Sequence, residues 1–166
     1  FHDSRTLLNF VMPGMYIADS TSFNTVISKE GFIDARLSSS RIAFNEQFLK
    51  GLSMTADNRD DNISGELLCK EMKVASLSLK DNSFQIFAND NHVGASYRFD
   101  NQEDLVNRGE FITIGDLNRD EYGTVELGLS ILPSALYLNT HEWSILPSDL
   151  FIRDGDIEVR SFEVAG

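Results

Sequence analysis

Cysteine, proline and tryptophan are scarce in this chain of 166 residues, which contains one Cys, three Pro and one Trp. Because Cys69 is the only cysteine, an intramolecular disulfide is excluded, and we expect Cys69 to be partly buried in a strand. The chain also lacks zinc-ligand spacing, a phosphate-binding glycine loop and a dinucleotide fingerprint. We therefore expect neither a metal nor any other cofactor.

Basic residues are few: 14 Lys and Arg stand against 26 Asp and Glu, giving a net charge of −12. A nucleic-acid partner is disfavoured because phosphate binding requires a basic surface. Simple electrostatic docking on an anionic membrane is disfavoured for the same reason. No apolar run reaches the 18 or so residues that a membrane-spanning helix requires.

Signals of catalysis are also missing. The three histidines are His2, His92 and His141, and none belongs to a G-x-S-x-G nucleophile turn. Acidic residues are plentiful enough for a hydrolase with paired carboxylates, but no pair stands out. The residues therefore favour a protein that is not an enzyme.

One loop resembles a calcium site only in part. Asp116, Asn118 and Asp120 have the spacing of the first three ligands of a calcium loop. The sixth position, which requires Gly, is Glu121, and the twelfth, which requires an acid, is Leu127. The segment is thus expected to be a hairpin loop without metal.

The pattern that is present is two-residue alternation, which predicts strands with one apolar face. Turn residues separate the alternating runs every eight to twelve residues or so. The runs cover residues 33–37, 52–56, 63–69, 84–88, 93–99, 110–114, 124–130 and 157–164.

Extended along the whole chain, this pattern predicts about ten to thirteen strands in one all-β domain over residues 1–166. At about 4.8 Å per strand, such a sheet is about 50 Å long and usually curls, closes or folds over. The candidates are a closed barrel, a two-sheet β-sandwich and one long antiparallel sheet bent along its length.

The last run contains a change of alternation. Ile157 and Val159 share one parity, whereas Phe162 and Val164 have the other. Arg160-Ser161 lies between them, so we expect a bulge or bend at this position.

A family resemblance rests on residues 138–164. Trp143, Pro147-Ser148, the turn Asp154-Gly155 between Ile152 and Ile157, and Phe162 follow one another in this segment. The order resembles a repeating signature of the TamB family of AsmA-like proteins, the inner-membrane components of the translocation and assembly module. Residues 109–139 and 12–44 also look like sequence from this family.

The resemblance implies a fold and a function. TamB-like proteins are long periplasmic proteins anchored in the inner membrane of Gram-negative bacteria, and their β-sheet curls into an open apolar groove called a β-taco. The groove is thought to carry phospholipid between the inner and outer membranes. TamB itself partners an outer-membrane protein of the Omp85 class and supports outer-membrane protein assembly. The start at Phe1 and the end soon after a strand lead us to expect a segment excised from such a protein.

Apolar side chains on the expected inner face are the candidates for contact with acyl chains, and a sealed core would show the same periodicity. A closed sandwich would instead make the chain a recognition module, such as an adhesin or a carbohydrate-binding domain. The lipid-groove candidates are Leu52, Met54, Phe84, Ile86, Ile112, Ile114, Val125, Leu127, Leu129, Ile157 and Val159.

Overall fold

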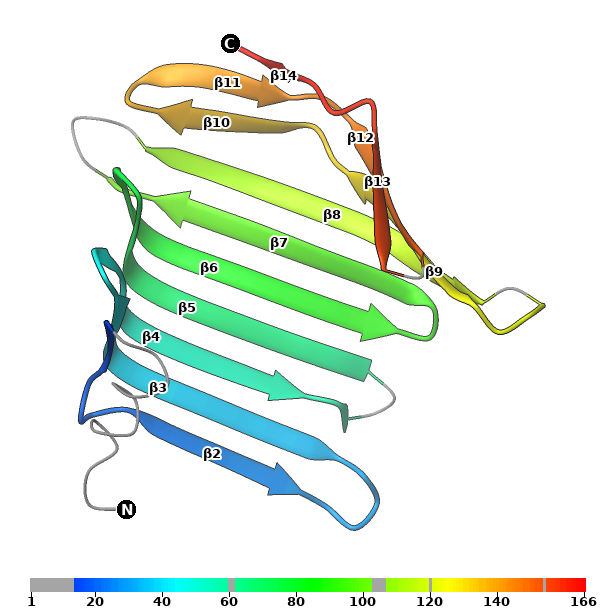
Figure 1. Cartoon of the computed structure of the whole chain (residues 1–166), viewed down its shortest axis with the longest axis horizontal. Helices are drawn as coiled ribbons and strands as arrows, with labels where there is room; N and C mark the ends of the chain where they lie inside the picture. The colour runs from blue at the N-terminus through cyan, green and yellow to red at the C-terminus, as the bar shows by residue number, and fades with distance from the viewer. Residues whose placement is uncertain (1–13, 60–61, 103–106, 120, 154) are drawn as a thin grey trace.

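The computed structural model describes residues 14–59, 62–102, 107–119, 121–153 and 155–166. These residues form 14 strands, all of which belong to one antiparallel sheet (Figure 1). The strands are β1 (Met15–Ile17), β2 (Ser22–Ile27), β3 (Ile33–Phe44), β4 (Gln47–Asp57), β5 (Asn62–Val74), β6 (Leu77–Asn89), β7 (His92–Asp100), β8 (Arg108–Arg119), β9 (Val125–Ile131), β10 (Ser134–Leu138), β11 (His141–Ile145), β12 (Ser148–Arg153), β13 (Asp156–Arg160) and β14 (Val164–Ala165).

From β2 to β9, and in the pairs β10–β11 and β12–β13, neighbours in the sheet are neighbours in the chain, as expected when short turns join antiparallel strands. The exceptions are the pairs β1–β3, β8–β10, β9–β12 and β11–β14. The sheet runs from β2 at one end to β13 and β14 at the other, and these end strands do not pair with each other (Figure 1). The all-β prediction is therefore confirmed. The described residues form one long sheet that is neither closed nor strongly curled, instead of the barrel or the two-sheet sandwich.

The sheet divides at β8. One edge of β8 pairs with β7 along most of its length, whereas the other edge pairs with β9 through Thr113–Arg119 and with β10 through Arg108 and Gly109. Beyond β8 the sheet continues as two shorter arms. One arm contains β9, β12 and β13, and the other contains β10, β11 and β14.

Two identical sequence segments explain the division. Residues 130–134 and 144–148 both read Ser-Ile-Leu-Pro-Ser, and each proline separates two strands. Proline has no N–H to donate to a ladder, so a strand ends there. In each copy the serine hydroxyl donates a hydrogen bond of 3.0 Å to the carbonyl of the leucine two residues earlier.

A similar interruption crosses the unbroken strands β3 to β6. The ladders lack the pairs that would join Ser40, Gly51, Lys70 and Asp81, although the register on both sides is the same. Gly51 and Asp81 have φ values of 60° and 47°, in the left-handed region that glycine adopts most readily. We call these interruptions, together with the strand breaks at Pro133, Pro147 and Ser161, the seam.

At the seam the side-chain alternation shifts by one residue. In β6, Leu79 and Asn82 are both buried, three residues apart, and in β3, Ser40 and Arg41 are both exposed. The same shift occurs at Ser161, whose φ is 58° and which separates β13 from β14. The bulge or bend expected at Arg160-Ser161 thus coincides with a break between two strands.

The best-buried part of the molecule lies along the seam. Leu79, Phe99, Leu136 and Ile145 form an apolar cluster that joins β6, β7, β10 and β11. Ser39, Leu52, Cys69 and Asn82 continue the buried line across β3 to β6. The core is therefore a narrow strip within one sheet.

Candidate functional site: an uncovered apolar face

The register places directly opposite residues on the same side of the sheet, so it identifies complete rows of side chains across the strands. Four successive rows make up what we call the apolar face. They are Phe23–Leu37–Met54–Leu67–Phe84–Tyr97–Phe111, then Thr25–Ala35–Ala56–Gly65–Ile86–Ala95–Thr113–Ile131, then Ile63–Ala88–Val93–Gly115–Leu129–Leu150–Val159, and finally Leu117–Leu127–Ile152–Ile157.

None of these four rows contains Asp, Glu, Lys or Arg. The interleaved rows on the other side, which we call the polar face, carry the charges of the same strands. Two of them read Asn24–Arg36–Thr55–Glu66–Gln85–Ser96–Ile112 and Ser22–Ser38–Ser53–Leu68–Ser83–Arg98–Glu110. The sheet thus has one face without charge and one face suited to water.

The apolar face is only partly buried. Phe84 and Ile86 are 39% and 40% exposed, and Ile157 is 67% exposed. All 14 strands of the described residues lie in the one sheet. Tyr97, Phe111 and Ile131 of this face pack against the buried cluster of Leu79, Phe99, Leu136 and Ile145, and the rest of the face leaves large apolar side chains exposed. Exposed apolar patches on soluble monomers rarely exceed a few hundred Å², and larger ones mark interaction sites.

Seven of the eleven lipid-groove candidates lie on this face. Leu52 is buried at the seam, and Val125 lies at the tip opposite Arg119. The seven that belong to the four rows are Met54, Phe84, Ile86, Leu127, Leu129, Ile157 and Val159.

Ile112 and Ile114 were predicted on the wrong face. The register pairs Ile112 with Ser96 and Ile114 with Gly94, which places both on the polar face. The run around them is apolar in both parities, because Phe111 alternates with these two isoleucines. The pairing of Phe111 with Tyr97 decides the matter, and pairing is not visible in a single strand.

Sequence reasoning missed several members of the apolar face. Leu37, Leu67, Tyr97, Phe111 and Leu117 belong to it and were not among the candidates. Odd-numbered positions along β8 could have identified some of them, because every second residue of a strand lies on the same face. These positions are Phe111, Thr113, Gly115 and Leu117.

A small hydrogen-bond network lies beneath one end of the apolar face. Tyr97 Oη donates to Asn82 Oδ1 at 2.8 Å, and Asn82 Nδ2 donates to the carbonyls of Leu79 and Cys69. Burial raises the pKa of Tyr97 to about 12, and burial also raises the pKa of the Cys69 thiol. These side chains satisfy carbonyls beside the interrupted ladders, so the network has a structural role.

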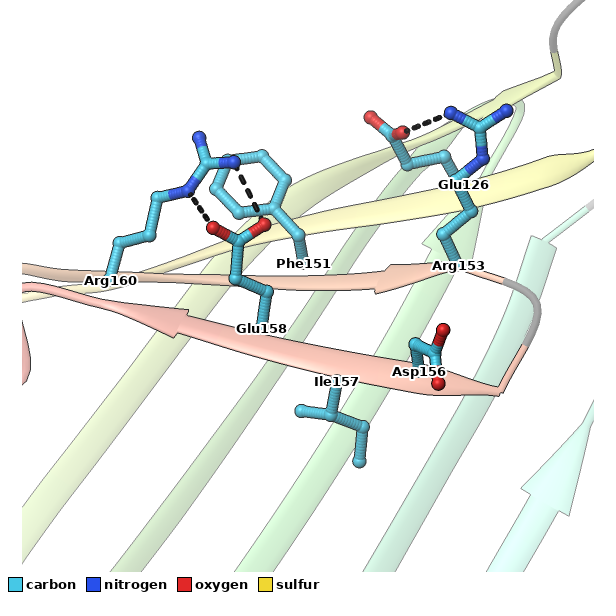
Figure 2. Close-up of a pocket in the computed structure, with 7 residues that line it drawn as sticks. All are labelled: Glu126, Phe151, Arg153, Asp156, Ile157, Glu158 and Arg160. Carbon is cyan, nitrogen blue, oxygen red and sulfur yellow. Dashed lines mark hydrogen bonds and ion pairs between the residues drawn. The ribbon is translucent and has the colours of Figure 1, made fainter.

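The polar face contains an open hollow of about 680 Å³ between β9, β12 and β13. Arg160 binds Glu158 through two hydrogen bonds of 2.7 and 2.8 Å and lies over the ring of Phe151. Arg153 lies 3.8 Å from Glu126. Figure 2 shows Ile157 pointing away from these groups, toward the apolar face.

The hollow has no feature of a catalytic centre. Its charged groups are exposed, and the Arg160 guanidinium holds the pKa of Glu158 below its usual range through hydrogen bonding. Within the described ranges, no group of three or more His, Cys, Asp or Glu side chains is placed to hold a metal ion. Asp120, which completes the partial calcium spacing with Asp116 and Asn118, lies outside those ranges. Asp116 contacts His92 Nδ1 at 2.6 Å.

Among the residues that the structure describes, no helix has the length and apolar character needed to cross a membrane. Comparison of the chain with protein-family models, curated protein sequences and solved structures found no match.

Proposed function

We propose that this chain is a non-enzymatic, lipid-carrying segment of an envelope biogenesis protein, and that its apolar face holds phospholipid acyl chains. The observation that supports the proposal most is the contrast between two faces of the same strands. One face carries four uncharged rows with many exposed apolar side chains, and the other carries the charges.

Burial of acyl chains on this face is energetically favourable. Each CH₂ group removed from water contributes about 0.8 kcal/mol. The row from Phe23 to Phe111 crosses seven strands, which at about 4.8 Å spacing corresponds to about 29 Å. That length is close to the thickness of the hydrocarbon core of a bilayer, about 30 Å.

An open groove is the shape that we propose for the lipid-bound sheet. The seam supports this proposal, because the ladder pairs are missing at the same level in neighbouring strands β3 to β6. A sheet bends most easily where its ladder is interrupted. Bending toward the apolar face would enclose the acyl chains and leave the headgroups in water.

The wider setting of the proposal comes from the resemblance to TamB-like proteins. We propose that the parent protein is anchored in the inner membrane, works in the periplasm and transfers phospholipid toward the outer membrane. An Omp85-class partner and a role in outer-membrane protein assembly belong to the same proposal.

A recognition module for protein or carbohydrate is the second candidate. The observation in its favour is the hollow around Phe151, where an aromatic ring lies among carboxylates and guanidinium groups. Arg160 lies over that ring, with its Cζ atom 4.4 Å from the ring centroid, so the ring is not a free platform for a sugar.

Photo-crosslinking tests the proposed function. A photo-reactive amino acid at Leu127, on the apolar face, is expected to form adducts with phospholipid vesicles under illumination. The matched control is Glu126, its neighbour on the polar face, which lies opposite Arg153. Equal adducts at both positions, or none at either in a folded protein, would exclude the apolar face as the lipid-binding surface.

A further inference from the structure

We propose that, in the absence of lipid, a second copy of this chain covers the apolar face, so that two sheets pack face to face as a two-layer β-sandwich. This inference goes beyond the proposed function, because it concerns the lipid-free protein alone. The inference rests on the exposed area, the surface shape and the lack of charge of the apolar face.

The exposed area is sufficient for a stable dimer. An aromatic or large aliphatic side chain that is about half exposed leaves roughly 80–100 Å² accessible. Ten such side chains therefore provide about 800 Å² or more per copy, the amount that a standard interface buries on each partner. The ten are Phe23, Ile27, Ile33, Ile63, Phe84, Ile86, Leu117, Val125, Ile157 and Val159.

The shape of the apolar face is largely complementary to itself. The row from Phe23 to Phe111 consists of large side chains, whereas the next row is mostly small, with Ala35, Ala56, Gly65 and Ala95 and with Ile86 and Ile131 as its large members. Rows are about 6.8 Å apart along the strands. A two-fold axis between the two rows places the large row of each copy over the small row of the other, as inner faces interdigitate in sandwiches.

Charge favours this arrangement over pairing of sheet edges. In the face-to-face dimer the apolar rows meet without any charged group, and the two polar faces lie outward. Packed sheets are about 10 Å apart, so the charges of the two copies lie at or beyond the Debye length at 0.1 M salt. Edge pairing through β13 would instead bring Asp156 and Glu158 of each copy to a distance of one strand spacing.

Native mass spectrometry and sedimentation velocity of the purified, lipid-free chain test the inference. The expected species is a dimer of two 18.6 kDa chains. A monomer of the lipid-free chain at micromolar concentration, with its lipid content checked by mass, would overturn the inference. Neither result would decide the Leu127 crosslinking experiment, so the two proposals fail independently.

Substitutions identify the surface used. Phe84→Asp is expected to weaken the dimer by about tenfold or more in Kd. Ile63→Asp is a second variant. It is expected to disturb folding less, because the Ile63 side chain is already 54% exposed to solvent. The matched control is Phe87→Asp, since Phe87 is 53% exposed but lies on the polar face, and it is expected to leave Kd unchanged. A dimer that persists in both apolar-face variants would overturn the face-to-face arrangement.

Discussion

The two faces of this sheet are made by the same strands, yet they differ in almost every physical property. Leu67 and Leu68 are consecutive residues of β5. Leu67 lies in a row between Met54 and Phe84, whereas Leu68 lies between Ser53 and Ser83. The comparison shows that the side of the sheet, and not the residue type, decides what an apolar side chain contacts. A single layer can therefore be stable in water on one side and require a partner on the other.

The largest expected loss of stability comes from a substitution in the buried apolar cluster. Phe99 is 3% exposed and packs with Leu79, Leu136 and Ile145. Phe99→Ala is expected to lower the free energy of unfolding by about 3–5 kcal/mol, because it leaves a cavity. Urea denaturation measures this loss. Phe87→Ala on the polar face is the control, and an equal loss in both would contradict the contrast between the faces.

The second effect tests the hydrogen bonds at the seam. Asn82→Ala leaves the carbonyls of Leu79 and Cys69 and the hydroxyl of Tyr97 without their side-chain partner. We expect the free energy of unfolding to fall by about 2 kcal/mol, as for other buried polar groups left unsatisfied. Urea denaturation again provides the value. A neutral substitution would mean that the Asn82 side chain does not stabilise the interrupted ladder.

The third effect compares Leu67 with Leu68 directly. Leu67→Lys places a charge among apolar neighbours and is expected to cost about 1 kcal/mol of stability and to reduce binding to phospholipid vesicles. Leu68→Lys is expected to change stability by less than about 0.5 kcal/mol and to leave vesicle binding unaltered. Urea denaturation and vesicle co-sedimentation measure the two properties. Equal loss of vesicle binding in both variants would remove the distinction between the faces.

The fourth effect depends on pH. The pKa of Tyr97 is raised from 10.0 to about 12 in the folded chain, so the unfolded chain loses this proton first as the pH rises. The stability contribution is therefore complete below pH 10 and is lost between pH 10 and about pH 12. The difference in urea midpoint between the wild type and Tyr97→Phe should shift with pH in this window. A difference that is constant across the window would refute the raised pKa.

The smallest effect is expected on the polar face. Arg160 and Glu158 form a close pair, but their side chains are 56% and 60% exposed. Exposed ion pairs contribute little, because water and salt screen them. Arg160→Ala should leave the thermal midpoint unchanged within error, as followed by circular dichroism. A clear drop would show that the hollow in Figure 2 has a structural role.

Alternation predicted the strands well, because its period of two is a local property of an extended chain. The run 84–88 lies within β6, 93–99 within β7, and 110–114 within β8. The change of parity near Ser161 was also visible locally. The faces of Ile112 and Ile114 were not, because both parities of that run are apolar and only pairing with β7 separates them.

The sequence by itself determined that this chain forms strands, that most strands have one apolar side, and that the ladder stops at Pro133 and Pro147, since these follow from side-chain period and from the missing proline N–H. Only the tertiary structure decided that all the described strands join one sheet, that their apolar sides align into continuous uncharged rows, and that many side chains of these rows stay exposed. The physical reason is that pairing and register are relations between strands distant in the chain, and a groove, a core and a dimer interface all require the same period within each strand.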